Sequence, residues 1–159
     1  MTRAPAAEPT AEDLAALQAL LDRSALAATP ALADSIGYPE RQMTARELVE
    51  FWRATSLVAM ATVGPAGQPH IAPVHADLRG TTLHLVVYDD AVRRSDVARD
   101  PRVAFTTWRD GAAVILYGRA REIPDTLGEA RPGRSGRPRR VVSLQVTLTR
   151  VHAMRAPST

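Results

Sequence analysis

Two adjacent arginines, Arg93 and Arg94, are the side chains of this sequence best suited to ligand chemistry. They come shortly after an apolar, β-branched run that ends at Tyr88, and they open a helix-compatible segment. The start of a helix gathers free N–H groups and positive dipole potential, and guanidinium groups form two-point hydrogen bonds with phosphate. The pattern therefore indicates a phosphate site. The alternative is that both side chains are solvated or paired with nearby acids, namely Asp89, Asp90 or Asp96.

Histidines are the other residues that could hold a metal or take part in catalysis. His70 and His75 are five positions apart, so they point to opposite faces of a regular strand, and His84 follows on the next one. A zinc site needs three ligands to converge, which this spacing does not demand. The chain has no cysteine, which excludes a thiol nucleophile and a Cys-based metal centre. No serine lies in a nucleophile-elbow motif, and we assign neither a metal ligand nor a catalytic side chain.

The elements that position these residues lie in a central stretch, 56–103. Its apolar, β-branched and aromatic runs end at Gly/Pro turns, which is typical of antiparallel strands. Pro69 and Pro73 each remove a backbone donor, so the second run is expected to be irregular around Pro73. The strands are predicted over 56–63, 70–78 and 82–88.

Helices are predicted on both sides of these strands. Small and charged residues with Val92 and Val97 as apolar anchors indicate a helix that ends before Pro101. Capping boxes at Thr10 and Thr44 begin two earlier helices, each with apolar residues at helical spacing. The helices are predicted over 11–25, 44–54 and 91–99.

The second half of the chain predicts three more strands around an arginine-rich connection. Asp110-Gly111 is a hairpin turn, and Gly118 is expected to mark a bulge in a long strand. Segment 124–140 mixes Arg with Gly and Pro, which is typical of a solvated, flexible connection. The alternative is a mobile basic flap that attracts anions to a nearby ligand cleft. The strands are predicted over 102–108, 112–123 and 141–151.

The order and spacing of these signals resemble the FMN-binding split-barrel superfamily of pyridoxamine 5′-phosphate oxidase-like proteins. The shared pattern is A-T-V-x-x-x-G-x-P-x-x-x-P-V, which stands here from Ala61 to Val74. After the next strand the family shows a basic segment, a short helix and Asp/Asn-Pro-x-Val, matched here from Arg93 to Val103. The resemblance covers about 44–153. Arginine takes the place of the family's usual lysine, because the chain contains no lysine.

The resemblance implies a mainly β protein with flanking helices. It predicts a six-stranded antiparallel split β-barrel over 44–153, after an N-terminal tail and helical extension over 1–43 and before a C-terminal tail over 154–159. It also implies a homodimer that binds its cofactor between the subunits.

The same resemblance implies where the cofactor lies. Arg93 and Arg94 would bind its phosphate, the backbone of 71–75 would contact the ring edge, and Tyr88 and Ser95 would lie near the ribityl–phosphate arm. Trp108 would stack beside a cofactor bound by the other subunit, although a core or interface tryptophan is an equal alternative. The predicted cofactor-binding residues are Ile71, Ala72, Pro73, Val74, His75, Tyr88, Arg93, Arg94, Ser95 and Trp108.

The function implied is FMN-dependent hydride or electron transfer to a small-molecule substrate, with the reactivity supplied by the cofactor. The deazaflavin coenzyme F420 is an alternative, because the arginine-rich segment suits its polyanionic tail. Heme ranks third, and a non-catalytic cofactor- or heme-binding module is a further alternative. Oxidation of pyridoxamine phosphate itself is not expected, because the family's substrate-binding C-terminal motif is not visible in 141–159.

Composition bounds these hypotheses. The chain has 159 residues, which suits one domain, and a formal net charge of +3. Aromatic residues make up only 4%, and no dense basic and aromatic face is visible, so nucleic-acid binding is not expected. Acidic residues interrupt the Ala-rich first 30 positions, which argues against a signal peptide or a membrane helix. We expect a cytoplasmic protein.

Overall fold

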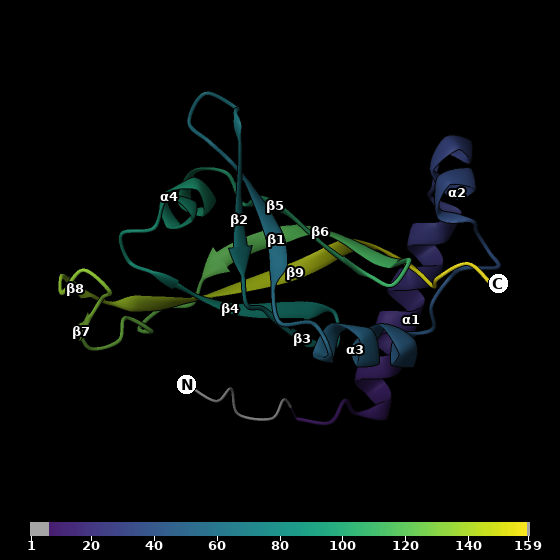
Figure 1. Ribbon diagram of the computed structural model, residues 1–159, viewed down its shortest axis with the longest axis horizontal. Coiled ribbons are helices and arrows are strands. Elements are labelled where there is room, and N and C mark those ends of the chain that lie inside the picture. The colour runs from purple at the N-terminus through teal and green to yellow at the C-terminus, as the bar shows by residue number, and fades with distance from the viewer. Residues whose placement is uncertain (1–6, 159) are drawn as a thin grey trace.

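The protein is described here by a computed structural model, which covers residues 7–158; residues 1–6 and 159 of the predicted tails lie outside the described part. Its centre is a seven-stranded antiparallel sheet in the order β2-β1-β5-β6-β9-β4-β3, with helices around it (Figure 1). The predicted mainly β fold with flanking helices is confirmed. The strands of the sheet are β1 (Val58–Val63), β2 (Pro69–Val74), β3 (Asp77–Arg79), β4 (Thr82–Tyr88), β5 (Arg102–Arg109), β6 (Ala112–Glu122) and β9 (Val141–Met154).

The sheet has seven strands where six were predicted, because the expected strand over 70–78 is divided. The chain leaves β2 after Val74 and pairs again only at Asp77, where β3 begins on the opposite edge of the sheet. At this break the Trp52 indole Nε1 donates a 2.9 Å hydrogen bond to the carbonyl of Ala76. Strand β2 lies at the edge of the sheet and pairs there with β1. Its register runs unbroken through Pro73, so the irregularity expected around Pro73 is not found there, and the interruption follows Val74 instead.

Strands β6 and β9 form the longest pairing of the sheet. Their register shifts between Tyr117 and Gly118, which confirms the predicted bulge. A Cβ atom at Gly118 would lie 2.5 Å from the carbonyl oxygen of Thr147, so only glycine lets the two backbones approach this closely. In Figure 1 the narrow ribbons of β1 and β2 cross the long ribbons of β6 and β9.

Helices cover the sheet with the apolar faces that the sequence indicated. Helix α1 (Ala11–Leu26) packs on β9, and α3 (Ala45–Arg53) packs near β3; both begin with the predicted capping boxes. Helix α2 (Pro30–Ile36) is a short addition, and α4 (Val92–Arg99) lies against β1, β4 and β6. All of the larger elements share one hydrophobic core, whose most buried large side chains include Phe105, Leu17, Leu48, Met60, Leu83, Leu116 and Leu144.

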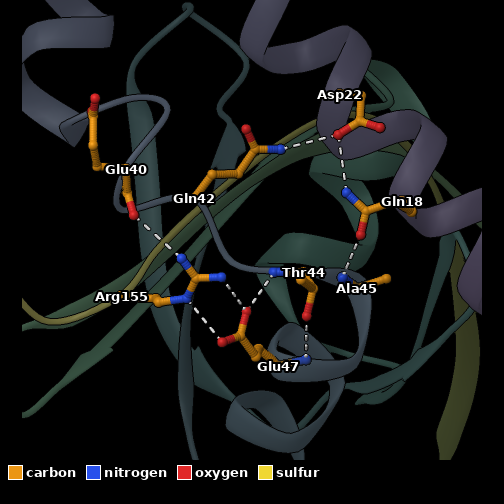
Figure 2. Close-up of polar contacts among 8 residues, drawn as sticks. All are labelled: Gln18, Asp22, Glu40, Gln42, Thr44, Ala45, Glu47 and Arg155. Carbon is orange, nitrogen blue, oxygen red and sulfur yellow. Dashed lines mark hydrogen bonds and ion pairs between the residues drawn. The ribbon is translucent and has the colours of Figure 1, made fainter.

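A polar network fastens the helices to the end of the last strand (Figure 2). The Arg155 guanidinium donates two 2.8 Å hydrogen bonds to the Glu47 carboxylate, which also accepts from the backbone N–H of Thr44. On α1, Gln18 accepts a hydrogen bond from the backbone N–H of Ala45. Arg155, which was assigned to the C-terminal tail over 154–159, is bound here to Glu47 at the start of α3.

The arginine-rich connection is more regular than its composition indicated. It forms a small hairpin from β7 (Arg131–Pro132) and β8 (Pro138–Arg139), apart from the main sheet. Arg139 ties this hairpin to the end of β4, because its guanidinium lies 3.5 Å from the Tyr88 ring centroid and 2.6 Å from a carboxylate oxygen of Asp90. Among residues 7–158, no helix combines the length and apolar character needed to cross a membrane.

Candidate functional site

Helix α4 presents Arg93 and Arg94 in its first turn. Ala91 is the N-cap, so the two arginines are the second and third helical residues, as the sequence predicted. The helix is held down mainly by Val97, which is buried, whereas the predicted anchor Val92 is 61% exposed. Val92 therefore does not anchor the helix to the core.

The two arginines have different surroundings. The Nε atom of Arg93 is buried and has no hydrogen-bond partner among the described residues. Arg94 instead donates to both carboxylate oxygens of Glu122 on β6, at 2.8 and 3.0 Å, and to the backbone carbonyl of Asp89. This pairing lowers the pKa of Glu122 below its ordinary value. A buried donor without a partner costs free energy unless a ligand or water satisfies it, so Arg93 is the better candidate for an anion.

Arg93 lies on the walls of two cavities. The large cavity, about 720 Å³, is formed by the end of β2, the loop to β3, and strands β4 and β9. Five of the predicted cofactor-binding residues line it: Pro73, Val74, His75, Tyr88 and Arg93. The small cavity, about 370 Å³, lies between β1, β2 and α4, and Ile71 and Ala72 line it together with Arg93. The structure thus brings seven of the ten predicted residues to cavities that share Arg93.

Three predicted residues lie elsewhere. Arg94 is bound to Glu122, and Ser95 is exposed on α4 and lines neither cavity. Trp108 is 72% exposed and lines neither cavity, but it lines an edge hollow of about 530 Å³ whose wall includes the predicted residues 71–73. The roles of these three residues stay predictions.

Sequence reasoning missed a polar cluster beside the small cavity, whose wall includes two members of the cluster, Thr62 and His70. Asp96 on α4 is 1% exposed, and its carboxylate accepts hydrogen bonds from Thr62 at 2.7 Å, from Arg99 at 2.8 Å and from His70 Nδ1 at 2.7 Å. Burial acts to raise the pKa of Asp96, but these hydrogen bonds outweigh it and hold the pKa below its ordinary value. A signal was present, since an aspartate on the core side of a short helix is rare unless it is paired.

The wall of the large cavity carries its own charge pattern. His84 lines it, and burial, followed by the positive charge of Arg79, lowers the pKa of that imidazole. Tyr88 lines the same wall beneath the Arg139 guanidinium. Among the described residues, no three His, Asp or Glu side chains gather in a way that could hold a metal ion.

Comparison with known families identifies this architecture. The family model for pyridoxamine 5′-phosphate oxidase matches residues 44–154, more than half of the chain. The chain belongs to the pyridoxamine 5′-phosphate oxidase family. The matched range runs from the start of α3 to the end of β9 and contains every residue of the two cavities.

Several solved structures share the fold of this chain at low sequence identity. A conserved hypothetical protein from Mycobacterium tuberculosis is 16% identical, with a TM-score of 0.60 over 76% of this chain and 93% of that one. A FAD-binding protein from Mesorhizobium loti is 17% identical, with a TM-score of 0.55 over 71% and 93%. The heme storage protein HutZ from Vibrio cholerae is 10% identical, with a TM-score of 0.54 over 69% and 93%. No curated protein matches the chain.

Proposed function

We propose that the protein is a flavin-dependent oxidoreductase that binds FMN with its phosphate on Arg93. The observation that carries this proposal is the buried Nε of Arg93, which has no partner within the described chain and lies between two cavities. A phosphate oxygen is a suitable acceptor for this donor, and the guanidinium fork is suited to bind a second oxygen.

The shape of the site supports a cofactor of flavin size. The large cavity lies within the roughly 300 to 1,000 Å³ range of small-molecule and cofactor sites, and it combines apolar strand residues with a few polar groups. Edge strand β2 forms one of its walls. Within residues 7–158 no strand pairs with the outer side of β2, so the outward N–H and C=O groups of this edge are available to a heteroaromatic ring edge.

Within this proposal the chain binds and orients the cofactor. When bound, a flavin supplies two-electron hydride chemistry and one-electron chemistry that side chains cannot perform. Arg93 neutralises anionic charge, and the apolar residues Val74, Leu85 and Val87 on the cavity wall exclude water from the ring. The substrate class is a small molecule that reaches the large cavity.

The deazaflavin coenzyme F420 is the second candidate, and one observation favours it. The hairpin β7–β8 holds Arg139 over Tyr88 at the wall of the large cavity, with Arg137 3.5 Å from the same Asp90 carboxylate. These arginines would meet a polyanionic tail that extends beyond the phosphate. Heme stays the third candidate, on the likeness in fold to the heme storage protein.

A homodimer is part of the proposal, because the edge hollow exposes a contiguous apolar surface. Leu57, Ile71 and Trp108 are 48%, 74% and 72% exposed, and all three line this hollow at the β1–β2–β5 edge. Large apolar side chains grouped in this way are typical of interaction surfaces. A second copy on this edge would cover the patch and close the open side of the cavities along β2.

The proposal is tested by titrating the purified protein separately with FMN, F420 and hemin while following absorbance and fluorescence. We expect FMN to bind with micromolar or tighter affinity, and the complex to oxidise a reduced nicotinamide in the presence of an electron acceptor. Preferential binding of F420 would show that F420, not FMN, is the cofactor. If none of the three ligands binds, the cofactor-dependent function is contradicted, and a non-catalytic binding module is the remaining alternative.

A further inference from the structure

One face of β4 forms a wall of the large cavity. His84, Val86 and Tyr88 alternate along this strand, so their side chains lie on the same face, and all three line the cavity. Val86 is 59% exposed, although it is apolar and its strand is paired on both sides. The wall thus combines an imidazole with apolar surface that a ligand can cover.

The Thr82 hydroxyl determines which nitrogen of His84 carries the ring proton. Thr82 Oγ1 donates a 2.9 Å hydrogen bond to the carbonyl of Arg79, because a carbonyl oxygen can only accept. The hydroxyl proton is therefore used, so Oγ1 is the acceptor in its 3.1 Å contact with His84 Nε2. Nε2 carries the proton, and in the neutral imidazole Nδ1 has a lone pair.

The other ring nitrogen of His84, Nδ1, is available to a ligand. It has no hydrogen-bond partner within residues 7–158, and it is not one of the buried polar atoms. Burial, and then the positive charge of Arg79, lowers the pKa of His84, so the imidazole is mainly neutral near pH 7. His84 thus offers the large cavity a hydrogen-bond acceptor in a fixed position.

A cation lies close to this acceptor. Arg79, at the end of β3, lines the same cavity, and its guanidinium makes no hydrogen bond or ion pair within the described part of the chain. Arg93 is the second arginine on the wall, and Asp77 is the one acidic residue among the described residues that line it. The wall therefore has a net positive charge, and it suits an anion whose charge lies next to a hydrogen-bond donor.

We propose that the large cavity binds a 2-hydroxy carboxylate, with its carboxylate on Arg79 and its hydroxyl donating to Nδ1 of His84. The rest of the ligand lies on the apolar wall at Val86 and Val141. As the substrate class of the proposed oxidoreductase, this ligand rests on the proposed function; its binding at Arg79 and His84 does not.

The fixed acceptor makes His84 a residue that determines specificity. A carboxylate without the hydroxyl leaves Nδ1 unpaired, so its complex lacks one hydrogen bond. A 2-oxo carboxylate places a carbonyl oxygen against Nδ1, and two acceptors cannot form a hydrogen bond. The cavity should therefore bind a hydroxy acid more tightly than the acid without the hydroxyl or the corresponding oxo acid.

The first experiment measures the tautomer of His84 in the protein without ligand. Long-range proton–nitrogen correlation spectra of 15N-labelled protein at pH 8 distinguish a protonated ring nitrogen from one with a lone pair, and His84→Gln identifies the signals. We expect a protonated Nε2 and an unprotonated Nδ1. Thr82→Val, which keeps the shape but removes the hydroxyl, should let both tautomers appear. A protonated Nδ1 in the wild type overturns the inference.

The second experiment compares mandelate with phenylacetate, which has the same ring and carboxylate but no hydroxyl. Isothermal titration at pH 8 measures both affinities for the wild type and for variants of His84. We expect the wild type to bind one enantiomer of mandelate about fivefold more tightly than phenylacetate, as one hydrogen bond predicts. His84→Phe should lose this preference, and His84→Gln, whose side-chain oxygen can accept, should keep part of it.

Two further variants control this comparison. Ser143→Ala removes a different polar group from the same wall and should keep the preference for mandelate. Arg79→Gln should weaken the binding of mandelate and phenylacetate alike, about tenfold, because both share the carboxylate. A loss of affinity for mandelate alone in Arg79→Gln would overturn the assignment of the carboxylate to Arg79.

The titrations are made with and without FMN, so that this site and the flavin proposal are tested separately. If the wild type prefers mandelate and FMN does not bind, the hydroxy acid site stands and the flavin proposal fails. If FMN binds but the wild type and His84→Phe have the same preference, the role of His84 is overturned and the flavin proposal stands. Displacement of mandelate by FMN overturns its assignment as a substrate, and absence of mandelate binding at millimolar concentration overturns the site.

Discussion

Arg94 and Glu122 form a two-point ion pair that joins the first turn of α4 to the end of β6, with Nε–Oε2 and Nη2–Oε1 distances of 2.8 and 3.0 Å. The neighbouring Arg93 points to the cavities with its Nε unpaired among the described residues. Two consecutive basic residues thus have separate tasks: Arg94 holds the helix in place, and Arg93 is free to meet a ligand.

This division predicts different effects of the two arginines on cofactor binding. We expect Arg94→Gln to change the FMN dissociation constant by less than about threefold, because its guanidinium is already satisfied by Glu122. Isothermal titration of Arg94→Gln and Arg93→Gln, side by side, measures this difference. Equal losses of affinity in both variants would show that Arg94 leaves Glu122 to bind the cofactor.

The bulge in β6 predicts that a methyl group added at Gly118 lowers the stability of the protein. Gly118→Ala would place a Cβ atom 2.5 Å from the Thr147 carbonyl oxygen and 2.7 Å from Val146 Cγ1, so we expect a loss of about 1 to 3 kcal/mol in unfolding free energy. Gly128→Ala is the control, because its new Cβ would meet Val141 at an ordinary 3.5 Å. Urea denaturation compares the two variants, and equal stabilities would refute the close approach.

The ion pair between Glu47 and Arg155 predicts a pH-dependent contribution to stability. Hydrogen bonds from Arg155 are the main reason that the pKa of Glu47 falls from 4.5 to about 2. Because the folded-state pKa is the lower one, this stabilisation is present above about pH 4.5 and is lost as pH falls toward about 2. The carboxylate is 40% exposed, so solvent screening limits the effect to about 1 kcal/mol.

Denaturation of the wild type and Glu47→Gln at several pH values measures this contribution. We expect a difference of about 1 kcal/mol at pH 6 that disappears near pH 2. Glu50→Gln, on the exposed side of the same helix, should differ from the wild type by no more than about 0.5 kcal/mol. A difference between the wild type and Glu47→Gln that persists at pH 2 would show that the ion pair is not its source.

The apolar patch formed by Leu57, Ile71 and Trp108 predicts that a charge placed in it prevents dimer formation. Ile71→Asp should convert the proposed homodimer into monomers, since a carboxylate in the centre of an apolar interface lacks a partner. Leu26→Asp is the matched control, because Leu26 is 89% exposed at the end of α1, away from the patch. Light scattering after size-exclusion chromatography measures the molar mass of each variant in solution. If Ile71→Asp is still a dimer, the dimer interface does not lie on this edge.

The sequence predicts most of the fold because local signals agreed with the tertiary structure. Capping boxes, Gly/Pro turns and β-branched runs located α1, α3 and β4 to within a few residues. An interruption was expected around Pro73, but its place after Val74 was not, and the hydrogen bond found there comes from Trp52, 24 positions earlier in the chain. The same limit applies to Val92, whose apolar type does not reveal that it faces outward.

Only part of the candidate site was predicted, because the remaining contacts join residues far apart in the sequence. Arg93 was identifiable from its place after a strand and before a helix. The pairing that distinguishes Arg94 from Arg93 was not identifiable, because the partner Glu122 lies 28 positions further along the chain. The contact between His70 and Asp96 likewise joins positions 26 apart, and histidine spacing along one strand cannot reveal it.

The central claim is that Arg93 binds the phosphate of a flavin cofactor. The most direct measurement is the affinity of the wild type and Arg93→Gln for FMN and for riboflavin at pH 7 and fixed ionic strength. We expect the wild type to prefer FMN, and Arg93→Gln to lose about 10- to 100-fold in FMN affinity while its riboflavin affinity stays within about threefold. Equal losses for both flavins, or no loss for either, would contradict the assignment of Arg93 to the phosphate.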